Sequence, residues 1–271
     1  MEKKKSYGLL IAGAVLLIAS IILAVYTYNT SYQASLSAAE EAKLDLQRPY
    51  SYSLTALFLG ILLTAKGIYN ALHGVYRSVR PDIKRLAMTG LMAALCYIGF
   101  AFFKIPLGPG MAAFHFGNVF CVLGALLLGG YWGGLAGAIG MTVADLTTAY
   151  VTSAPKTFLL KLCIGLIVGF VAHKLFKLDK DHSAKYVTGV TILSCICGMA
   201  FNIIADPLVG YFYKTYLLGV PQDLAASLAK ISAGATAVNA VIAVVAASVF
   251  YLALRPALKK AGLFIHVTPT E

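Results

Sequence analysis

The sequence predicts an all-α integral membrane protein, and three observations carry that prediction. Of the 271 residues, 59% are hydrophobic and only 12% are charged, whereas about 25% of residues in soluble domains are charged. Several apolar stretches reach about 20 residues, the length that a helix needs to cross a hydrocarbon core of ~30 Å. Backbone polar groups in lipid must be satisfied within the segment, so we expect these stretches to be helices.

Hydropathy divides the chain into eight expected spans. They cover residues 7–28, 51–75, 86–103, 118–130, 132–150, 157–176, 186–211 and 231–254. The fourth is short for a full crossing, and Gly129 and Gly130 follow its apolar run. The first is not expected to be a cleaved signal peptide, because its apolar run is longer than a typical h-region.

The spans fall into two groups. The basic connector "RSVRPDIKR" separates the first two from a block of six, which predicts an N-terminal transmembrane hairpin (1–76) and a six-helix membrane domain (77–271). Apart from Lys66, which can snorkel towards an interface, the hairpin spans carry no intramembrane charge.

The distribution of basic residues predicts that both termini are cytoplasmic. With that orientation, 14 of the 22 Lys and Arg residues lie in inner segments, and five lie in outer loops: Lys43, Arg48, Lys104, Lys156 and Lys214. Basic residues concentrate on the cytoplasmic side of membrane proteins. These Lys and Arg residues also account for the net charge of +11. They form no continuous basic face, so a nucleic-acid partner is not expected.

Motifs for enzymatic chemistry are absent from the sequence. It contains neither G-x-x-x-x-G-K-[ST] nor H-E-x-x-H, so neither ATP hydrolysis by the chain itself nor a metalloprotease zinc site is expected. The five cysteines lie within expected spans and are interpreted as reduced, buried thiols. The expectation is a protein without catalytic residues, metal or cofactor.

A glycine-rich stretch runs from residue 129 to 161, "GGYWGGLAGAIGMTVADLTTAYVTSAPKTFLLK". On a helix, Gly133, Gly137, Gly140 and Ala144 share one face. Small residues let another helix approach closely, so this face is predicted to pack against a neighbouring helix rather than to contact a ligand.

Polar residues gather at matched depths in the outer half of the bilayer. With ~1.5 Å of rise per residue, Asp145, Lys161 and Asp206 lie roughly 7 Å below the outer surface, and Asn202 and Asn239 lie about 13 Å deep. His115 and Asn118 mark where the chain enters the membrane from outside. Intramembrane ionisable residues usually line a site or pathway, so we expect an outward vestibule, with no comparable polar set in the inner halves.

Each of these residues also has a structural interpretation. Asp145 and Lys161 can form an ion pair that only joins two helices, and Asn202 and Asn239 can be interhelical hydrogen-bonding residues. His115 can simply be solvated. Nearby aromatic residues could stack on a heteroaromatic ligand or belong to the membrane interface; they are Phe103, Phe114, Phe116, Tyr150, Tyr211 and Tyr213.

The central region resembles the substrate-binding S components of energy-coupling factor (ECF) vitamin transporters. The resemblance is carried by Gly117-Asn118 after a loop, a Gly-rich helix that ends in Ala-Asp-Leu (144–146), and Ala-Pro-x-Thr-Phe-x-x-Lys (154–161). It spans roughly residues 85–260 and is most similar to riboflavin-type and pyridoxine- or hydroxymethylpyrimidine-type members. Many relatives have Asp where Asn118 stands, and the first two spans are additional to the usual six helices.

The resemblance implies a transport function in which no bond of the ligand is made or broken. An S component of the bacterial cell membrane would capture a vitamin or precursor from outside, with both termini inside. A separate transmembrane coupling subunit and two ATPase subunits would drive uptake. The polar residues at matched depths would line its pocket, namely His115, Asn118, Asp145, Lys161, Asn202, Asp206 and Asn239. Gly90 and Ala94 resemble the small-residue patch that meets the coupling subunit, although ordinary internal packing is the alternative.

Other classes of protein remain open. A stand-alone secondary transporter of a small polar metabolite would usually place its site near the midplane between repeated halves, and the sequence shows no strong repeat. A membrane regulatory or partner protein is a further alternative.

Overall fold

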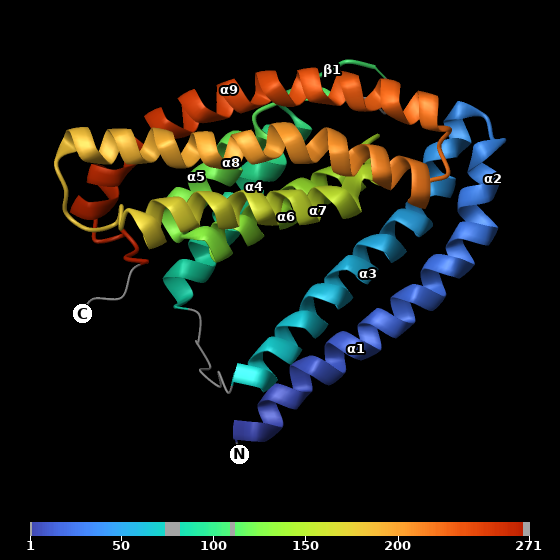
Figure 1. The fold of residues 1–271 in the computed structure, drawn as a ribbon, viewed down its shortest axis with the longest axis horizontal. Helices are drawn as coiled ribbons and strands as arrows, with labels where there is room; N and C mark the ends of the chain where they lie inside the picture. The colour runs from blue at the N-terminus through green and yellow to red at the C-terminus, as the bar shows by residue number, and fades with distance from the viewer. Residues whose placement is uncertain (1, 74–81, 109–111, 268–271) are drawn as a thin grey trace. The chain divides into compact units, whose positions relative to one another are not determined.

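The fold is described by a computed structural model that covers residues 2–73, 82–108 and 112–267 (Figure 1). Helices form at all eight places where hydropathy predicts a span, which confirms the all-α membrane fold. They are α1 (Glu2–Thr27), α3 (Glu40–His73), α4 (Ile83–Ala101), α5 (Gly117–Leu128), α6 (Gly130–Leu146), α7 (Ala154–Gly169), α8 (Ala184–Phe212) and α9 (Gln222–Lys260).

Shorter elements join or extend these helices. A π-helical turn η1 (Tyr28–Tyr32) and α2 (Gln33–Leu36) follow α1, and the 3-10 turn η2 (Val151–Ser153) precedes α7. Two further π-helical turns, η3 (Phe170–Leu175) and η4 (Tyr213–Leu217), continue α7 and α8.

Six segments of the described chain are long and apolar enough to cross a membrane. They are Leu10–Leu36, Ala42–Ile68, Ile83–Ala101, Val151–Leu175, Ala184–Leu217 and Gln222–Lys260. Helices α5, with 12 residues, and α6, with 17, are shorter. At ~1.5 Å per residue α5 rises only about 18 Å, and the chain turns at Gly129, which has φ of 84°. The fourth span is therefore short for a full crossing, as expected from the sequence.

The chain divides into two compact units. The first comprises Met1–Pro81 with Asp145–Pro155, and the second comprises Asp82–Ala144 with Lys156–Glu271. The expected boundary between residues 76 and 77 stays a prediction, because residues 74–81, which include the first part of the basic connector (77–85), lie outside the described residues. The association of segment 145–155 with the N-terminal hairpin was not indicated by the sequence.

In the first unit, α1 and α3 run antiparallel in close contact. A Cβ atom added to Gly13 would lie 2.6 Å from the Thr64 backbone nitrogen, and one added to Gly67 would lie 2.7 Å from the Leu10 Cα. The glycines therefore allow the two backbones to touch. In Figure 1 these helices are blue and cyan.

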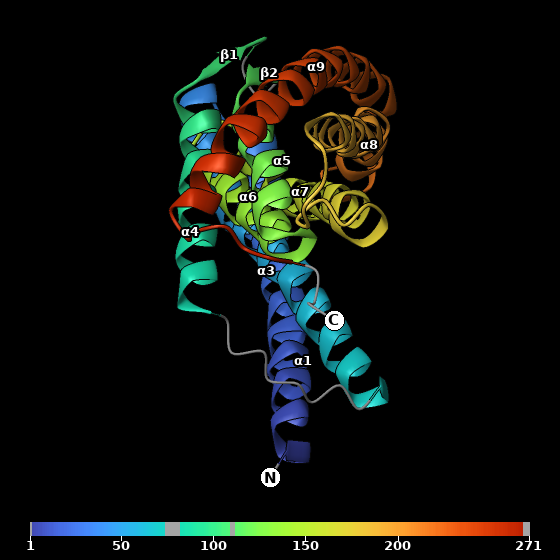
Figure 2. The same ribbon diagram turned by 90° about the vertical axis from the view of Figure 1, so that its left-hand side faces the viewer.

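In the second unit, α5 is the central helix. Eleven of its twelve residues are buried, Phe120 being the exception, and it contacts α4, α8 and α9. Helices α8 and α9 lie against each other, as Figures 1 and 2 both show. Burial on all sides explains why α5 is apolar all round.

A short antiparallel ribbon connects α4 to α5. Strand β1 (Lys104–Pro106) pairs with β2 (Ala113–His115), and Lys104 lies opposite His115. This ribbon was not predicted from the sequence, although the Gly108-Pro109-Gly110 segment between the strands is a turn signal.

The glycine-rich face of α6 packs as predicted. A Cβ added to Gly133 would lie 2.2 Å from the Ala125 nitrogen on α5, and one added to Gly140 would lie 2.1 Å from the Ala93 carbonyl oxygen on α4. No side chain fits between these backbones. The absence of Cβ atoms at the two glycines therefore allows α6 to pack directly against both helices.

Candidate functional site

Asp206 is the centre of a polar network in the second unit. Its carboxylate accepts hydrogen bonds from Lys156 Nζ at 2.8 Å, Ser232 Oγ at 2.6 Å and Thr236 Oγ1 at 3.0 Å. Ser232 and Thr236 lie four residues apart, on one face of α9. The network therefore joins the start of α7 to α8 and α9.

The position of Lys156 differs from the expectation. The sequence predicts an outer loop for Lys156, but this residue lies in the first turn of α7 and is 9% exposed. It forms an ion pair with Asp206. A buried ammonium group requires a partner of opposite charge, and Asp206 supplies one, so Lys156 is part of the polar interior.

Asn239 holds the ribbon against α9. Its Oδ1 accepts the His115 backbone N–H at 3.0 Å, and its Nδ2 donates to the Ala113 carbonyl at 2.9 Å. The amide thus pairs with β2 in both directions, as a neighbouring strand would. The proposed ligand role of Asn239 stays a prediction, and the structure adds a positioning role.

His115 lies at the inner edge of the ribbon, beside Phe100. The two ring centroids are 4.7 Å apart in an edge-to-face arrangement. Burial, the largest effect, together with the charges of Lys161 and Lys104 lowers the pKa of His115 to about 3, although Asp206 acts in the opposite direction. His115 is therefore a neutral imidazole near two charged members of the predicted set, not a solvated surface residue.

Asn118 on α5 and Asn202 on α8 are each 1% exposed. The Oδ1 atom of each is buried without a hydrogen-bond partner in the part of the chain that the structure describes, and so is His115 Nδ1. Thr142 Oγ1 on α6 is likewise buried without a hydrogen-bond partner among these residues. Thr142 was not predicted as a site residue, because a lone hydroxyl in an apolar helix carries no strong signal. Unsatisfied buried polar atoms are rare in native proteins.

Lys161 and Asp145 are both buried, but in different units. Lys161 on α7 is 6% exposed and Asp145 at the end of α6 is 2% exposed. Cys121 Sγ lies 3.7 Å from the Lys161 carbonyl oxygen, which places this part of α7 against α5. Asp145 belongs to the first unit, so its pairing with Lys161 stays a prediction from the sequence.

The aromatic residues considered for stacking are not equivalent. Phe103 and Phe116 are 61% and 43% exposed, with ring centroids 6.5 Å apart, so they belong to the surface near the ribbon. Tyr213 is buried at 4% exposure. Among these three, Tyr213 is the residue whose ring lies in the protein interior.

The far end of the second unit also contains buried polar residues, which corrects the expectation of apolar inner halves. His173 Nδ1 lies 3.6 Å from Asp179 Oδ1, and both residues are at most 5% exposed. His173 Nε2 is 3.0 Å from the Leu126 carbonyl oxygen, and Asp179 accepts the Val267 N–H at 2.8 Å. This cluster ties the α7–α8 connection to the C-terminal segment.

The small-residue patch on α4 lies on the protein surface. Gly90 and Ala94 are exposed, and a Cβ atom added to Gly90 would meet nothing within 4 Å. Internal packing, the alternative left open by the sequence, is therefore not the role of Gly90 in the described structure.

A comparison with protein families decides the class of the chain. A family model described as "ECF-type riboflavin transporter, S component" matches residues 81–256, well over half of the chain. The chain belongs to this family. No curated protein and no solved structure matches it.

The matched region of this S component begins before α4 and extends into α9, while α1 to α3 lie before it. It contains every predicted site residue and both residues of the α4 patch. An S component is a non-enzymatic membrane protein that binds a substrate for transport, so the polar residues above are assessed as binding groups rather than as catalysts.

Proposed function

We propose that the chain is the substrate-binding subunit of an ECF importer in the cell membrane. It captures riboflavin or a related vitamin or precursor from outside. A separate coupling subunit and two ATPase subunits then drive its uptake. Both termini are cytoplasmic in this proposal, which the distribution of Lys and Arg supports.

The observation that carries the proposal is a set of buried polar atoms that have no hydrogen-bond partner among the described residues. Asn118 Oδ1, Asn202 Oδ1 and His115 Nδ1 come from α5, α8 and β2. Leaving a buried polar group unpaired costs about 1–3 kcal/mol. A ligand that supplied hydrogen bonds to these three atoms would remove that cost.

The chemistry of these groups suits a flat heteroaromatic molecule with N–H and carbonyl groups. The two amide oxygens accept hydrogen bonds, and a neutral imidazole can either donate or accept. Lys161 adds a buried ammonium group that can donate to a ring carbonyl. Apolar walls with a few placed polar groups are typical of small-molecule sites.

Asp206 has a different role within the same proposal. Its two carboxylate oxygens already accept three hydrogen bonds, so it fixes the helices around the pocket. Lys156, Ser232 and Thr236 share this supporting role, and Asn239 supports the ribbon. These residues act on the ligand through the positions of other groups.

Ligand binding by the purified full-length protein tests the proposal. We expect quenching of riboflavin fluorescence on binding, and native mass spectrometry with a panel of vitamins and precursors should show one bound molecule. Binding of a different panel member would change the substrate but keep the function. If no vitamin or precursor binds and the protein transports a metabolite alone in proteoliposomes, the secondary-transporter alternative is correct.

A further inference from the structure

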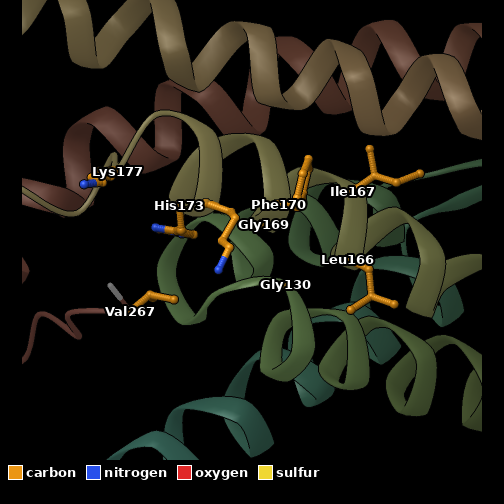
Figure 3. A pocket seen from close by; sticks show the side chains of 9 residues that line it. Gly130, Leu166, Ile167, Gly169, Phe170, His173, Lys177 and Val267 are labelled. Atoms are coloured by element: carbon orange, nitrogen blue, oxygen red, sulfur yellow. The ribbon is translucent and has the colours of Figure 1, made fainter. Parts of the chain in front are cut away.

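A groove opens beside the end of α7, away from the proposed ligand site. It has a volume of about 810 Å³ and is lined by α7, η3, the start of α6 and Val267. Figure 3 shows these side chains around it. None of the predicted substrate-binding residues lines this groove.

The floor of the groove is backbone. A Cβ atom added to Gly169 on α7 would lie 2.1 Å from the Gly130 nitrogen on α6. The two helices therefore touch where neither has a side chain, and the groove is shaped by glycine on both sides.

The wall along α7 is apolar and exposed. Leu166 and Phe170 are 42% and 54% exposed, and they lie four residues apart on one helical face, with Ile167 between them. All three lie within the membrane-spanning segment Val151–Leu175. In a bilayer this wall meets acyl chains.

The end of the groove is basic. Lys174 and Lys177 line it, both are exposed, and Lys177 lies just beyond the apolar segment. Lys177 has φ of 46°, a left-handed conformation that non-glycine residues adopt rarely and that clusters at functional sites. Backbone bonds hold this turn, since the Leu178 N–H donates to the Ala172 carbonyl at 2.8 Å.

We propose that this groove binds an anionic phospholipid, with the phosphate between Lys174 and Lys177 and an acyl chain along Leu166 and Phe170. From Leu166 to Lys174 the chain rises by at most about 12 Å, the value for an α-helix, because part of this stretch is the π-helical turn η3. This is less than half of a hydrocarbon core of ~30 Å, so the groove fits within one leaflet. Basic pockets between helices at the membrane surface suit anionic headgroups.

A comparison of the binding of two lipids tests the proposal. Full-length protein in detergent is titrated with short-chain phosphatidylglycerol or phosphatidylcholine, and bound lipid is counted by native mass spectrometry. Each basic residue near an anionic surface contributes roughly five-fold to binding. We expect phosphatidylglycerol to bind at least ten-fold more tightly than phosphatidylcholine, and K174Q/K177Q to bring the two lipids within about three-fold.

The matched control is K185Q/K260Q, which removes the same charge from two exposed lysines that do not line the groove. It should keep the preference. Equal losses in both double variants would show a general surface-charge effect and overturn the proposal. Folding is checked by the thermal unfolding temperature, which K174Q/K177Q should leave within about 2 °C of that of the control.

Two further measurements separate the lipid from other occupants. Leu166→Trp obstructs the apolar wall and should weaken binding of both lipids about equally. If glycerol 3-phosphate binds as tightly as the lipid and L166W has no effect, the groove is a phosphate site rather than a lipid site. If K174Q/K177Q keeps its lipid preference but no longer assembles with coupling and ATPase subunits, the groove is a protein-contact surface and the proposal fails.

Discussion

Two asparagine residues with the same expected depth have different environments in the structure. The Asn239 amide is engaged in both directions with β2, whereas Asn202 Oδ1 has no hydrogen-bond partner among the described residues. A leucine at either position keeps the branching of asparagine at Cγ, although it is larger, and it removes the amide. The two substitutions should therefore affect different properties.

We expect Asn202→Leu to weaken vitamin binding about five- to ten-fold, the worth of one hydrogen bond of about 1 kcal/mol or slightly more. Thermal stability should change little. Asn239→Leu should instead lower stability by about 1–3 kcal/mol for each backbone group of β2 that it leaves buried and unpaired. Unfolding in detergent and ligand titration, measured on both variants, check this. A large loss of stability in Asn202→Leu would show that its amide is structural.

For the predicted pair of Asp145 and Lys161, a structural role and a ligand role can also be distinguished by measuring stability and affinity. If the two residues only neutralise each other, Asp145→Asn or Lys161→Met alone costs ~3–5 kcal/mol, because a buried charge is left uncompensated. The double substitution should then restore folding. If Lys161 also touches the ligand, the double variant folds but binds weakly, since methionine lacks the ammonium donors. Near-normal affinity in a stable double variant would exclude the ligand role.

The sequence predicted part of the buried polar set for a physical reason. Amide or charged groups such as Asn118, Asn202 and Lys161 stand out in apolar helices, because lipid excludes them. Ser232 and Thr236 do not stand out, since a hydroxyl can bond to its own helix at residue i−4. Lys156 was misplaced because its position near a span end is typical of an interfacial lysine, and its partner is distant in sequence.

At the scale of elements, α6 shows how glycine positions set helix distance. Gly133 and Gly137 bring α6 against α5, where added Cβ atoms would lie 2.2 Å and 2.3 Å from Ala125 N and Cys121 Sγ. The periodicity of the sequence predicted this face, but it could not give the partners, which depend on tertiary packing. The β1–β2 ribbon was missed because three-residue strands leave almost no pattern.

A pair of glycine-to-alanine variants tests the packing of α6. Gly234 on α9 is exposed, and a Cβ there meets nothing within 4 Å. Gly234→Ala should therefore raise stability by up to about 1 kcal/mol through helix propensity. Gly133→Ala gains the same propensity but forces α5 and α6 apart, so its unfolding temperature should fall. Stabilisation by both variants would contradict the close approach.

The exposed patch on α4 is the proposed contact with the coupling subunit. Gly90→Leu/Ala94→Leu should abolish co-purification with the coupling and ATPase subunits while leaving vitamin binding intact. The matched control is Gly189→Leu/Gly234→Leu, because both glycines are exposed and an added Cβ atom at either meets nothing. Loss of assembly in both variants would point to a general effect of bulk at the helix surface.

At the scale of the whole molecule, hydropathy was sufficient for the fold class but not for its divisions. Every predicted span contains a helix, because lipid forces the backbone to bond locally. The grouping of Asp145–Pro155 with Met1–Pro81 depends on contacts between segments far apart in sequence, and no local pattern encodes it. The orientation in the membrane is likewise a property of the whole chain, and it rests on the Lys and Arg distribution alone.

Cysteine labelling in intact cells tests that orientation. The starting variant has the five native cysteines replaced, because Cys163 and Cys197 are partly exposed. Single cysteines then replace Ser37, Gln222 or Asp181, all of which are exposed. Lys156 is unsuitable as an outer position, since it is buried and paired with Asp206.

With cytoplasmic termini, Ser37 in the α2–α3 turn and Gln222 at the start of α9 face outward, while Asp181 between α7 and α8 faces the cytoplasm. An impermeant maleimide should therefore label the first two in intact cells and the third only after the membrane is opened. The reverse pattern would place the proposed vitamin site on the cytoplasmic side, where it could not capture an external substrate. Labelling of both Gln222 and Asp181 in intact cells would mean that α8 does not cross the membrane. With 29 residues, α8 is long enough to cross it.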